Sequence, residues 1–234
     1  MQLYFCLRKN LVIQLLFRNI IYNLIIYNTG MQHITQDTSL IEIFSTQSIK
    51  KTLTVSEWVS FNYLVILQDN AEIDFDIHCA GIGSKAIIKI LCIGKSGHRI
   101  ASNIITSLDA NHASADVYIL SLLKDGSDLN VHGNITLSPD VAKVSGHLLE
   151  ENIILGEKIK IRTAPILDVR SSDVSASHGC RVERLDPKRL FYMQSRGLTQ
   201  SESQSLILDG YLNSMFEWFD IGQDMIDDIK TQII

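Results

Sequence analysis

The sequence lacks paired cysteines and any cluster of basic residues, and each absence excludes a class of protein. Its 234 residues include four cysteines, none of them in a C-x-x-C pair, which excludes a self-contained zinc knuckle and a disulfide framework. The formal net charge is −5, and Lys and Arg are scattered, so no nucleic-acid-binding face is expected. Cys79 and Cys92 are predicted to be buried, reduced thiols of a cytoplasmic protein.

Motifs of the common catalytic folds are also missing. The segment 81–83 is a Gly-Ile-Gly turn and not a phosphate loop, because no Gly-Lys-Ser/Thr follows it. Nothing resembles the G-x-S-x-G nucleophile motif, and no groove of carboxylates like that of a glycoside hydrolase is evident. None of these patterns supports an enzyme.

Residues 1–30 differ in composition from the rest of the chain, with basic residues but no acidic one. A transmembrane helix needs about 20 mainly apolar residues, whereas Arg18 and Asn23 interrupt the apolar stretch, so we expect no stable membrane insertion. We interpret this segment as a disordered or non-native extension, with Met31 opening an N-terminal segment 31–51. A transit peptide, which would place the protein in the stroma of an organelle, is the alternative.

Residues 52–183 are predicted to form a β core. From Ala71 to Ile77 apolar and acidic residues alternate, which is typical of a half-buried strand. Glycines such as Gly94 and Gly97 mark turns, and no long amphipathic helix interrupts the region, which excludes alternating β–α units. The further predicted strands are Val59–Leu67, Ala86–Ile93, Ala115–Leu123, Asn134–Leu137, Asn152–Leu155, Lys158–Ile161 and Ile166–Val169.

A weak internal repeat favours one β architecture over the others. Asn134–Leu149 overlays Asn152–Leu167 without a gap, with several identical or similar apolar positions. Two units of roughly 20 residues, each too small to bury its own apolar face, are typical of a parallel β-helix. A β-sandwich gives no reason for successive units to resemble each other. The prediction is a right-handed parallel β-helix.

Residues 184–234 are predicted to be a helical segment that follows the β core. The first helix covers Pro187–Arg196, because Asp186 caps its start and Gly197 ends it. The T-Q-S-E sequence from Thr199 is a capping box for a second helix with an apolar stripe. Together they predict a C-terminal α-helical hairpin.

The junction between the β core and these helices carries recognisable motifs. Pro165–Phe216 contains P-I-L-D-V, D-V-S-A-S-H-G and L-F-Y-M-Q-S-R-G. These segments resemble the C-terminal signature of the SufB/SufD family of SUF-type iron–sulfur cluster assembly proteins, in a shortened form closer to SufD. Looser similarity extends back to about Asn103. The matching residues are Pro165, Leu167, Asp173, Val174, Ser177, His178, Gly179, Leu185, Asp186, Leu190, Phe191, Tyr192, Ser195, Arg196, Gly197 and Phe216.

The resemblance implies a non-enzymatic scaffold subunit that pairs with a SufB-like subunit, or with itself as a dimer, and binds a SufC-like ATPase. It implies that His178 takes part in ligating a transient iron–sulfur cluster. Cys180, two residues further on, would point to the same face if the segment is a strand. A cluster needs about four protein ligands, so this one would be shared across a subunit interface. The residues implied to contact the ATPase are Phe191, Tyr192, Ser195, Arg196 and Gly197.

Departures from the family pattern leave other interpretations open. Cys180 and Arg181 replace the family's Ala-Thr, and the family's usual N-terminal helical domain is missing. His178 as an ordinary loop histidine, and Cys180 as a small packing residue, are the simpler interpretations. The alternatives are an interaction-only SufD relative without cluster chemistry, or an unrelated β-helix enzyme or binding protein. Homodimer or heterodimer, cluster type and flavin use stay open.

Overall fold

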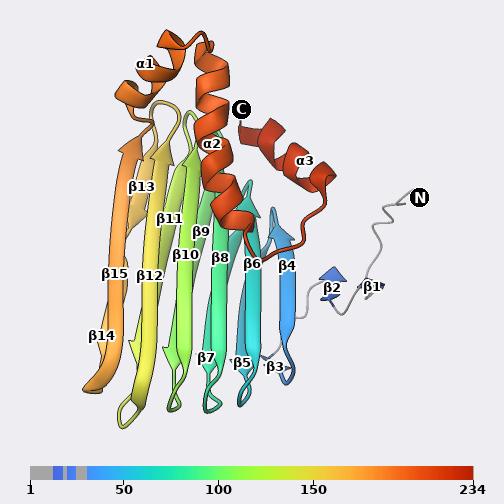
Figure 1. Cartoon of the computed structure of the whole chain (residues 1–234), viewed down its shortest axis with the longest axis vertical. Coiled ribbons are helices and arrows are strands. Elements are labelled where there is room, and N and C mark those ends of the chain that lie inside the picture. Colours follow the sequence, from blue (N-terminus) through green and yellow to red (C-terminus); the bar gives the residue numbers. More distant parts are fainter. Residues whose placement is uncertain (1–12, 18–19, 25–30, 234) are drawn as a thin grey trace.

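A computed structural model describes residues 13–17, 20–24 and 31–233 (Figure 1). The predicted N-terminal extension lies largely outside these residues. Its described part forms the short antiparallel pair of β1 (Ile13–Phe17) and β2 (Ile20–Leu24). In the described part of the chain, no helix is long and apolar enough to cross a membrane.

The body of the protein is a solenoid of two parallel sheets that face each other (Figure 1). One sheet has six strands in the order β15-β12-β10-β8-β6-β4. The opposite sheet has the order β13-β11-β9-β7-β5-β3, with β14 also paired to β11. The predicted parallel β-helix with C-terminal helices is therefore confirmed. The strands are β3 (Met31–Ile34), β4 (Thr38–Phe44), β5 (Ser48–Val55), β6 (Ser60–Gln68), β7 (Glu72–Cys79), β8 (Lys85–Gly94), β9 (Arg99–Leu108), β10 (Ser114–Leu123), β11 (Asp128–Leu137), β12 (Ala142–Ile154), β13 (Lys160–Thr163), β14 (Ile166–Val169) and β15 (Asp173–Arg184).

The coil of the solenoid is longer than the sequence repeat indicated. Asn134 pairs with Ile166, not with Asn152, and His147 contacts a residue 30 positions further along. One coil therefore takes about 30 residues and contributes a strand to each sheet. The prediction that Asn134–Leu149 and Asn152–Leu167 are successive coils was wrong, because their overlay superposes strands of opposite sheets. Any strand with one buried face shows the same alternation, so the match did not require adjacency.

The solenoid also begins earlier than the predicted boundary at residue 52. Strands β3, β4 and β5 lie within residues 31–55 and already pair in the two sheets. The interior here holds a buried ion pair between Lys51 and Glu42, with Nζ 2.6 Å from Oε1. The hydroxyl of Tyr63 donates to the same carboxylate. Strands β4 and β5 were missed because Glu42 and Lys51 interrupt their apolar alternation, and β3 is only four residues long.

Three helices follow the solenoid: α1 (Pro187–Ser195), α2 (Gln200–Phe216) and α3 (Gln223–Ile233). The side chain of Asp186 accepts from the backbone N–H of Lys188, and the predicted capping box from Thr199 is present. Helix α2 lies across the outer face of the six-stranded sheet (Figure 1). Its buried apolar residues pack on apolar residues of β6, β8, β10 and β12; they are Leu208, Leu212, Met215 and Phe216.

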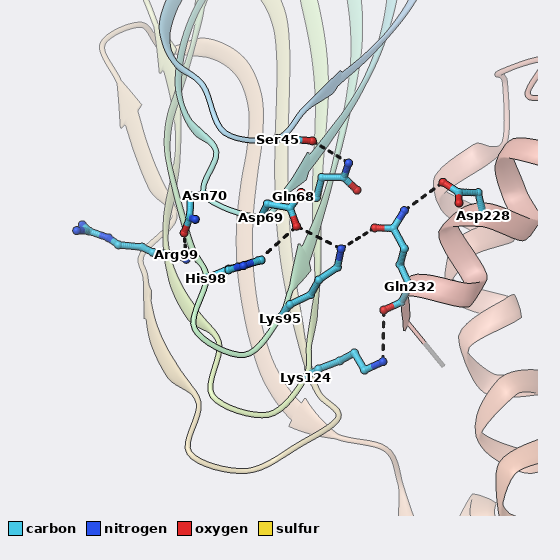
Figure 2. A network of polar contacts seen from close by, with 10 residues as sticks. All are labelled: Ser45, Gln68, Asp69, Asn70, Lys95, His98, Arg99, Lys124, Asp228 and Gln232. Carbon is cyan, nitrogen blue, oxygen red and sulfur yellow. Dashed lines mark hydrogen bonds and ion pairs between the residues drawn. The ribbon is translucent and has the colours of Figure 1, made fainter. Parts of the chain in front are cut away.

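The last helix is tied to the turns that join the two sheets. Figure 2 shows Gln232 of α3 between two lysines of these turns: Lys95 Nζ donates to its Oε1 at 2.9 Å, and Lys124 Nζ lies 3.4 Å from its backbone oxygen. Lys95 also pairs with Asp69 at 3.3 Å. Helix α3 therefore holds the end of the helical segment against the solenoid.

Candidate functional site at the open end of the solenoid

His178 and Cys180 lie on β15, the last strand of the six-stranded sheet. Val174 and Ala176 of the same strand pack against the interior core. Because side chains alternate along a strand, His178 and Cys180 continue this row on the inner face. No further coil covers them in the described part of the chain, so both are exposed. The predicted placement of the imidazole and the thiol on one face is thus what the strand provides.

A buried carboxylate lies directly behind these two side chains. Glu150 of β12 pairs with Cys180 in the strand register and is 1% exposed. The N–H of Gly133 donates to its Oε1 at 2.7 Å, and the hydroxyl of Thr163 donates to its other oxygen. Burial raises the pKa of the Glu150 carboxyl, and these two hydrogen bonds partly offset that effect.

Gly133 makes room for this carboxylate. A Cβ at position 133 would lie 2.9 Å from Oε1 of Glu150 and 2.8 Å from Leu148. A side chain at position 133 would therefore displace Leu148 or the Glu150 carboxylate. The glycine also lets the backbone N–H approach the carboxylate closely.

The thiol of Cys180 is joined to the same cluster. Asn152 Nδ2 lies 3.9 Å from its Sγ. Partial burial and the charge of Glu150 raise the pKa of the Cys180 thiol, while a hydrogen bond with Thr163 lowers it. Thr163 therefore contacts both the carboxylate and the thiol. In residues 13–17, 20–24 and 31–233, no three His, Cys, Asp or Glu side chains lie close enough to hold a metal ion by themselves.

Sequence reasoning missed Glu150, Thr163 and Asn152. The signal was present as two adjacent acidic residues and an asparagine within the otherwise apolar run Leu148–Leu155. In a strand with one face in the core, such a pair sends one carboxylate inward. Which of the two faces inward depends on the register, and the sequence repeat had placed the register wrongly.

The second predicted region, the helical hairpin, presents exposed aromatic residues. Helix α1 buries none of its residues, and Phe191 and Tyr192 are 74% and 59% exposed. The guanidinium of Arg196 lies over the Tyr192 ring, 5.3 Å from its centroid. Ser195 Oγ donates to the Tyr192 carbonyl at 2.6 Å. Gly197 has φ +94°, which a glycine tolerates at the end of a helix.

Comparison with known proteins decides the family. A family model described as "SUF system FeS cluster assembly, SufBD core domain" matches residues 30–211, which include strands β3 to β15 and most of α2. The chain belongs to the SufBD family. The match excludes the alternative of an unrelated β-helix protein, and places the chain in a family of the SUF system of iron–sulfur cluster assembly.

Several curated SufBD relatives are similar to parts of the chain. The iron–sulfur cluster assembly protein SufD of Escherichia coli is 28% identical over 97 residues, 42% of this chain and 23% of that protein. SufD of Bacillus subtilis is 25% identical over 156 residues, 66% of this chain and 34% of that protein. A SufBD family protein of Methanothermobacter thermautotrophicus is 26% identical over 136 residues, 58% of this chain and 33% of that protein. The aligned segments cover about a third or less of these relatives.

The two interior cysteines of this SufBD chain are packing residues. Cys79 and Cys92 are fully buried. Burial raises the pKa of each thiol to about 12, so neither forms a reactive thiolate near neutral pH. Cys180 is the exposed cysteine of the described residues, and Cys6 lies outside them.

Proposed function

We propose that this SufBD chain is a non-catalytic scaffold subunit on which an iron–sulfur cluster is assembled at a seam between two subunits. The observation that carries the proposal is the placement of His178 and Cys180 side by side on the inner face of β15. This strand forms the end of its sheet. An imidazole and a thiolate are both ligands that iron accepts in such clusters.

The number of ligands supports a shared site. A cluster requires about four protein ligands, and this chain offers the imidazole and the thiol, with the Glu150 carboxylate behind them. The end strand β15 pairs with β12 on one side, and its other edge can pair with a strand of a second chain. The second subunit, SufB-like or identical to this one, would supply the remaining ligands for the cluster that it helps to build.

Protonation at this site follows from its contacts. The thiol of Cys180 must lose its proton before its sulfur can bind iron, and its raised pKa keeps the proton in place until then. The exposed, unpaired Cys180 also favours a reducing compartment such as the cytoplasm.

The helical segment 184–234 would bind a SufC-like ATPase. Phe191 and Tyr192 are exposed on a helix that buries nothing, which is the property of an aromatic anchor for a partner. Arg196 and the turn at Gly197 lie beside them. ATP hydrolysis would belong to the partner, and the solenoid would carry the cluster.

The test is coexpression of the chain with a SufC-like ATPase and a SufB-like subunit. We expect copurification of the ATPase, and its loss when Phe191→Ser and Tyr192→Ser are combined. Failure of the unmodified chain to copurify with the ATPase would contradict the ATPase part. The cluster content of the His178→Ala complex then separates two functions: a scaffold loses cluster, whereas an interaction-only subunit retains it.

A further inference from the structure

A cleft of about 620 Å³ lies between the helical hairpin and the outer face of the six-stranded sheet. Residues of β10, β12 and β15 form its sheet wall, and residues of α1 and α2 form its helical wall. We call it the hairpin cleft. His178 and Cys180 are on the inner face of β15, so the cleft is a separate site. Sites for small organic ligands typically measure about 300–1,000 Å³.

The charged groups of the sheet wall are matched with one another. The guanidinium of Arg181 contacts the carboxylate of Glu151, and its Nε lies 3.2 Å from Oε1 of Glu183. Tyr118 also donates to Glu151 at 2.5 Å, and Tyr211 to Glu183 at 3.1 Å. Burial raises the pKa of both phenols, so they stay protonated as donors. Each carboxylate therefore has a cation and a hydroxyl, and neither is left to attract a cationic ligand.

The helical wall is apolar and faces the open space of the cleft. Met193 of α1 and Leu206 and Ile207 of α2 line it. Leu206 is 52% exposed, and α1 buries none of its residues. Apolar surface that stays in contact with water gains free energy when another apolar group covers it. The wall can therefore bind the apolar part of a ligand.

A glycine in the middle of α2 keeps the cleft open. Gly210 lines the cleft, and glycine is an unfavourable residue inside a helix. A Cβ at this position would meet no other atom within 4 Å, so the packing of the chain does not require a glycine here. A larger side chain would extend into the cleft. The glycine is thus explained by the space that it leaves.

Two arginines stand beside this apolar wall. Arg184 donates to the carbonyl of Gly156 at 3.0 Å and pairs with Glu157 at 3.3 Å. Arg189 is 3.9 Å from the carboxylate of Asp186, which is too long for a hydrogen bond. Its guanidinium is therefore the more available of the two.

The position of Arg189 on α1 suits a ligand with one charged end. Arg189 and Met193 both line the cleft and are four residues apart in the helix. Side chains at this spacing lie on the same face of a helix, one turn apart. A cation and an apolar surface are thus offered in sequence along one wall.

We propose that the hairpin cleft binds a small organic anion, a monocarboxylate with an apolar chain. The carboxylate binds the guanidinium of Arg189, whose parallel N–H donors match its two oxygens. The chain lies against Met193 and Leu206, in the space beside Gly210. This site needs neither a second subunit nor an ATPase, so it stands apart from the proposed function in cluster assembly.

Decanoate is the probe, added to the full chain and followed by isothermal titration calorimetry. We expect saturable binding of one decanoate per chain. Hexanoate should bind more weakly, because each methylene that leaves water adds up to about fourfold in affinity. Decylammonium has the same chain with the opposite charge and should not bind. The absence of saturable decanoate binding, or equal affinity for decylammonium, would overturn the proposal.

Two arginine variants test the charged end of the site. Arg189→Gln removes the cation, and we expect decanoate to bind about tenfold more weakly, the effect of losing a hydrogen bond to a charged group. Arg99→Gln is the matched control, because Arg99 is an exposed arginine on β9 of the opposite sheet. It should leave the affinity unchanged. Equal affinities of the two variants would contradict the assignment of the carboxylate to Arg189.

Two glycine variants test the location of the chain. Gly210→Met fills the cleft and should weaken decanoate binding at least tenfold. Gly222→Met is the control: a Cβ there also meets no other atom within 4 Å, but Gly222 precedes α3 and does not line the cleft. Thermal unfolding verifies that both variants are folded. If decanoate binds Gly210→Met as tightly as it binds Gly222→Met, it binds outside the cleft, and the proposal is overturned.

Discussion

Cys180 and Glu150 are neighbours across strands β15 and β12, and their side chains share the inner face of the sheet at the open end of the solenoid. Partial burial and the charge of Glu150 both disfavour ionisation of Cys180 and raise the pKa of its thiol. Thr163 contacts both groups. This arrangement links the protonation of the thiol to a carboxylate that solvent does not reach.

Removing the charge of Glu150 should activate the thiol. In Glu150→Gln, with Cys6→Ser, we expect the alkylation of Cys180 to follow a lower pKa, because the nearby negative charge is gone. The pH dependence of the iodoacetamide reaction measures this shift. The control is Glu157→Gln, which changes an exposed carboxylate in the turn between β12 and β13. An unchanged pH profile in Glu150→Gln would contradict the link between the thiol and the carboxylate.

The same substitution should alter the pH dependence of stability. Burial raises the pKa of Glu150 in the folded chain, so the folded state holds this proton more tightly than the unfolded state does. The carboxyl therefore contributes stability at low pH, and that contribution is lost as the pH rises from the unfolded pKa through the folded pKa. Above this window we expect Glu150→Gln to raise the free energy of unfolding by about 1 kcal/mol.

Urea unfolding at pH 8 and pH 4 would check this second prediction. The difference between Glu150→Gln and the unmodified chain should be present at the higher pH and shrink at the lower one. A difference of the same size at both values would mean that the carboxyl is charged, or neutral, throughout.

The buried pair of Lys51 and Glu42 should matter strongly for stability when one partner is removed. Lys51→Met leaves the Glu42 carboxylate unpaired in the interior, where both side chains are at most 5% exposed, and should cost about 3–5 kcal/mol. Adding Glu42→Leu should recover part of this loss, since no uncompensated charge is left, although the buried Tyr63 hydroxyl then loses its acceptor. Chemical denaturation measures both variants; a double variant as unstable as the single one would count against this account.

Replacing a glycine with alanine should have opposite effects at two positions, one between closely packed coils and one on an open face of a helix. A Cβ at Gly81 would lie 2.0 Å from the backbone nitrogen of Glu57 in the preceding coil, so Gly81→Ala should destabilise by about 3 kcal/mol or more. Gly210 faces open space within helix α2, and Gly210→Ala should stabilise by roughly 0.5–1 kcal/mol. Thermal unfolding of the two variants decides, and a tolerated Gly81→Ala would contradict the spacing of the coils.

Local signals in the sequence predicted local structure well. The alternation at Ile73, Phe75 and Ile77 identified β7, and the capping residues Asp186 and Thr199 identified α1 and α2. These features depend on residues close together in the chain. The period of two along a strand likewise placed His178 and Cys180 on one face.

The register between coils could not be predicted in the same way. Pairing Asn134 with Ile166 depends on turns and on packing between distant segments, and apolar alternation fits several registers equally. Glu150 was missed for the same reason, because its burial depends on Gly133 and Thr163 of the opposite sheet.

The central claim is that the imidazole of His178 reaches the iron of a cluster held between two subunits. X-ray absorption at the iron edge of the coexpressed complex measures the atoms bound to iron. We predict a nitrogen neighbour in the unmodified complex and in His33→Ala, an exposed histidine change at the other end of the solenoid, and its loss in His178→Ala. An iron environment of sulfur alone in the unmodified complex, or an unchanged nitrogen contribution in His178→Ala, would contradict the claim.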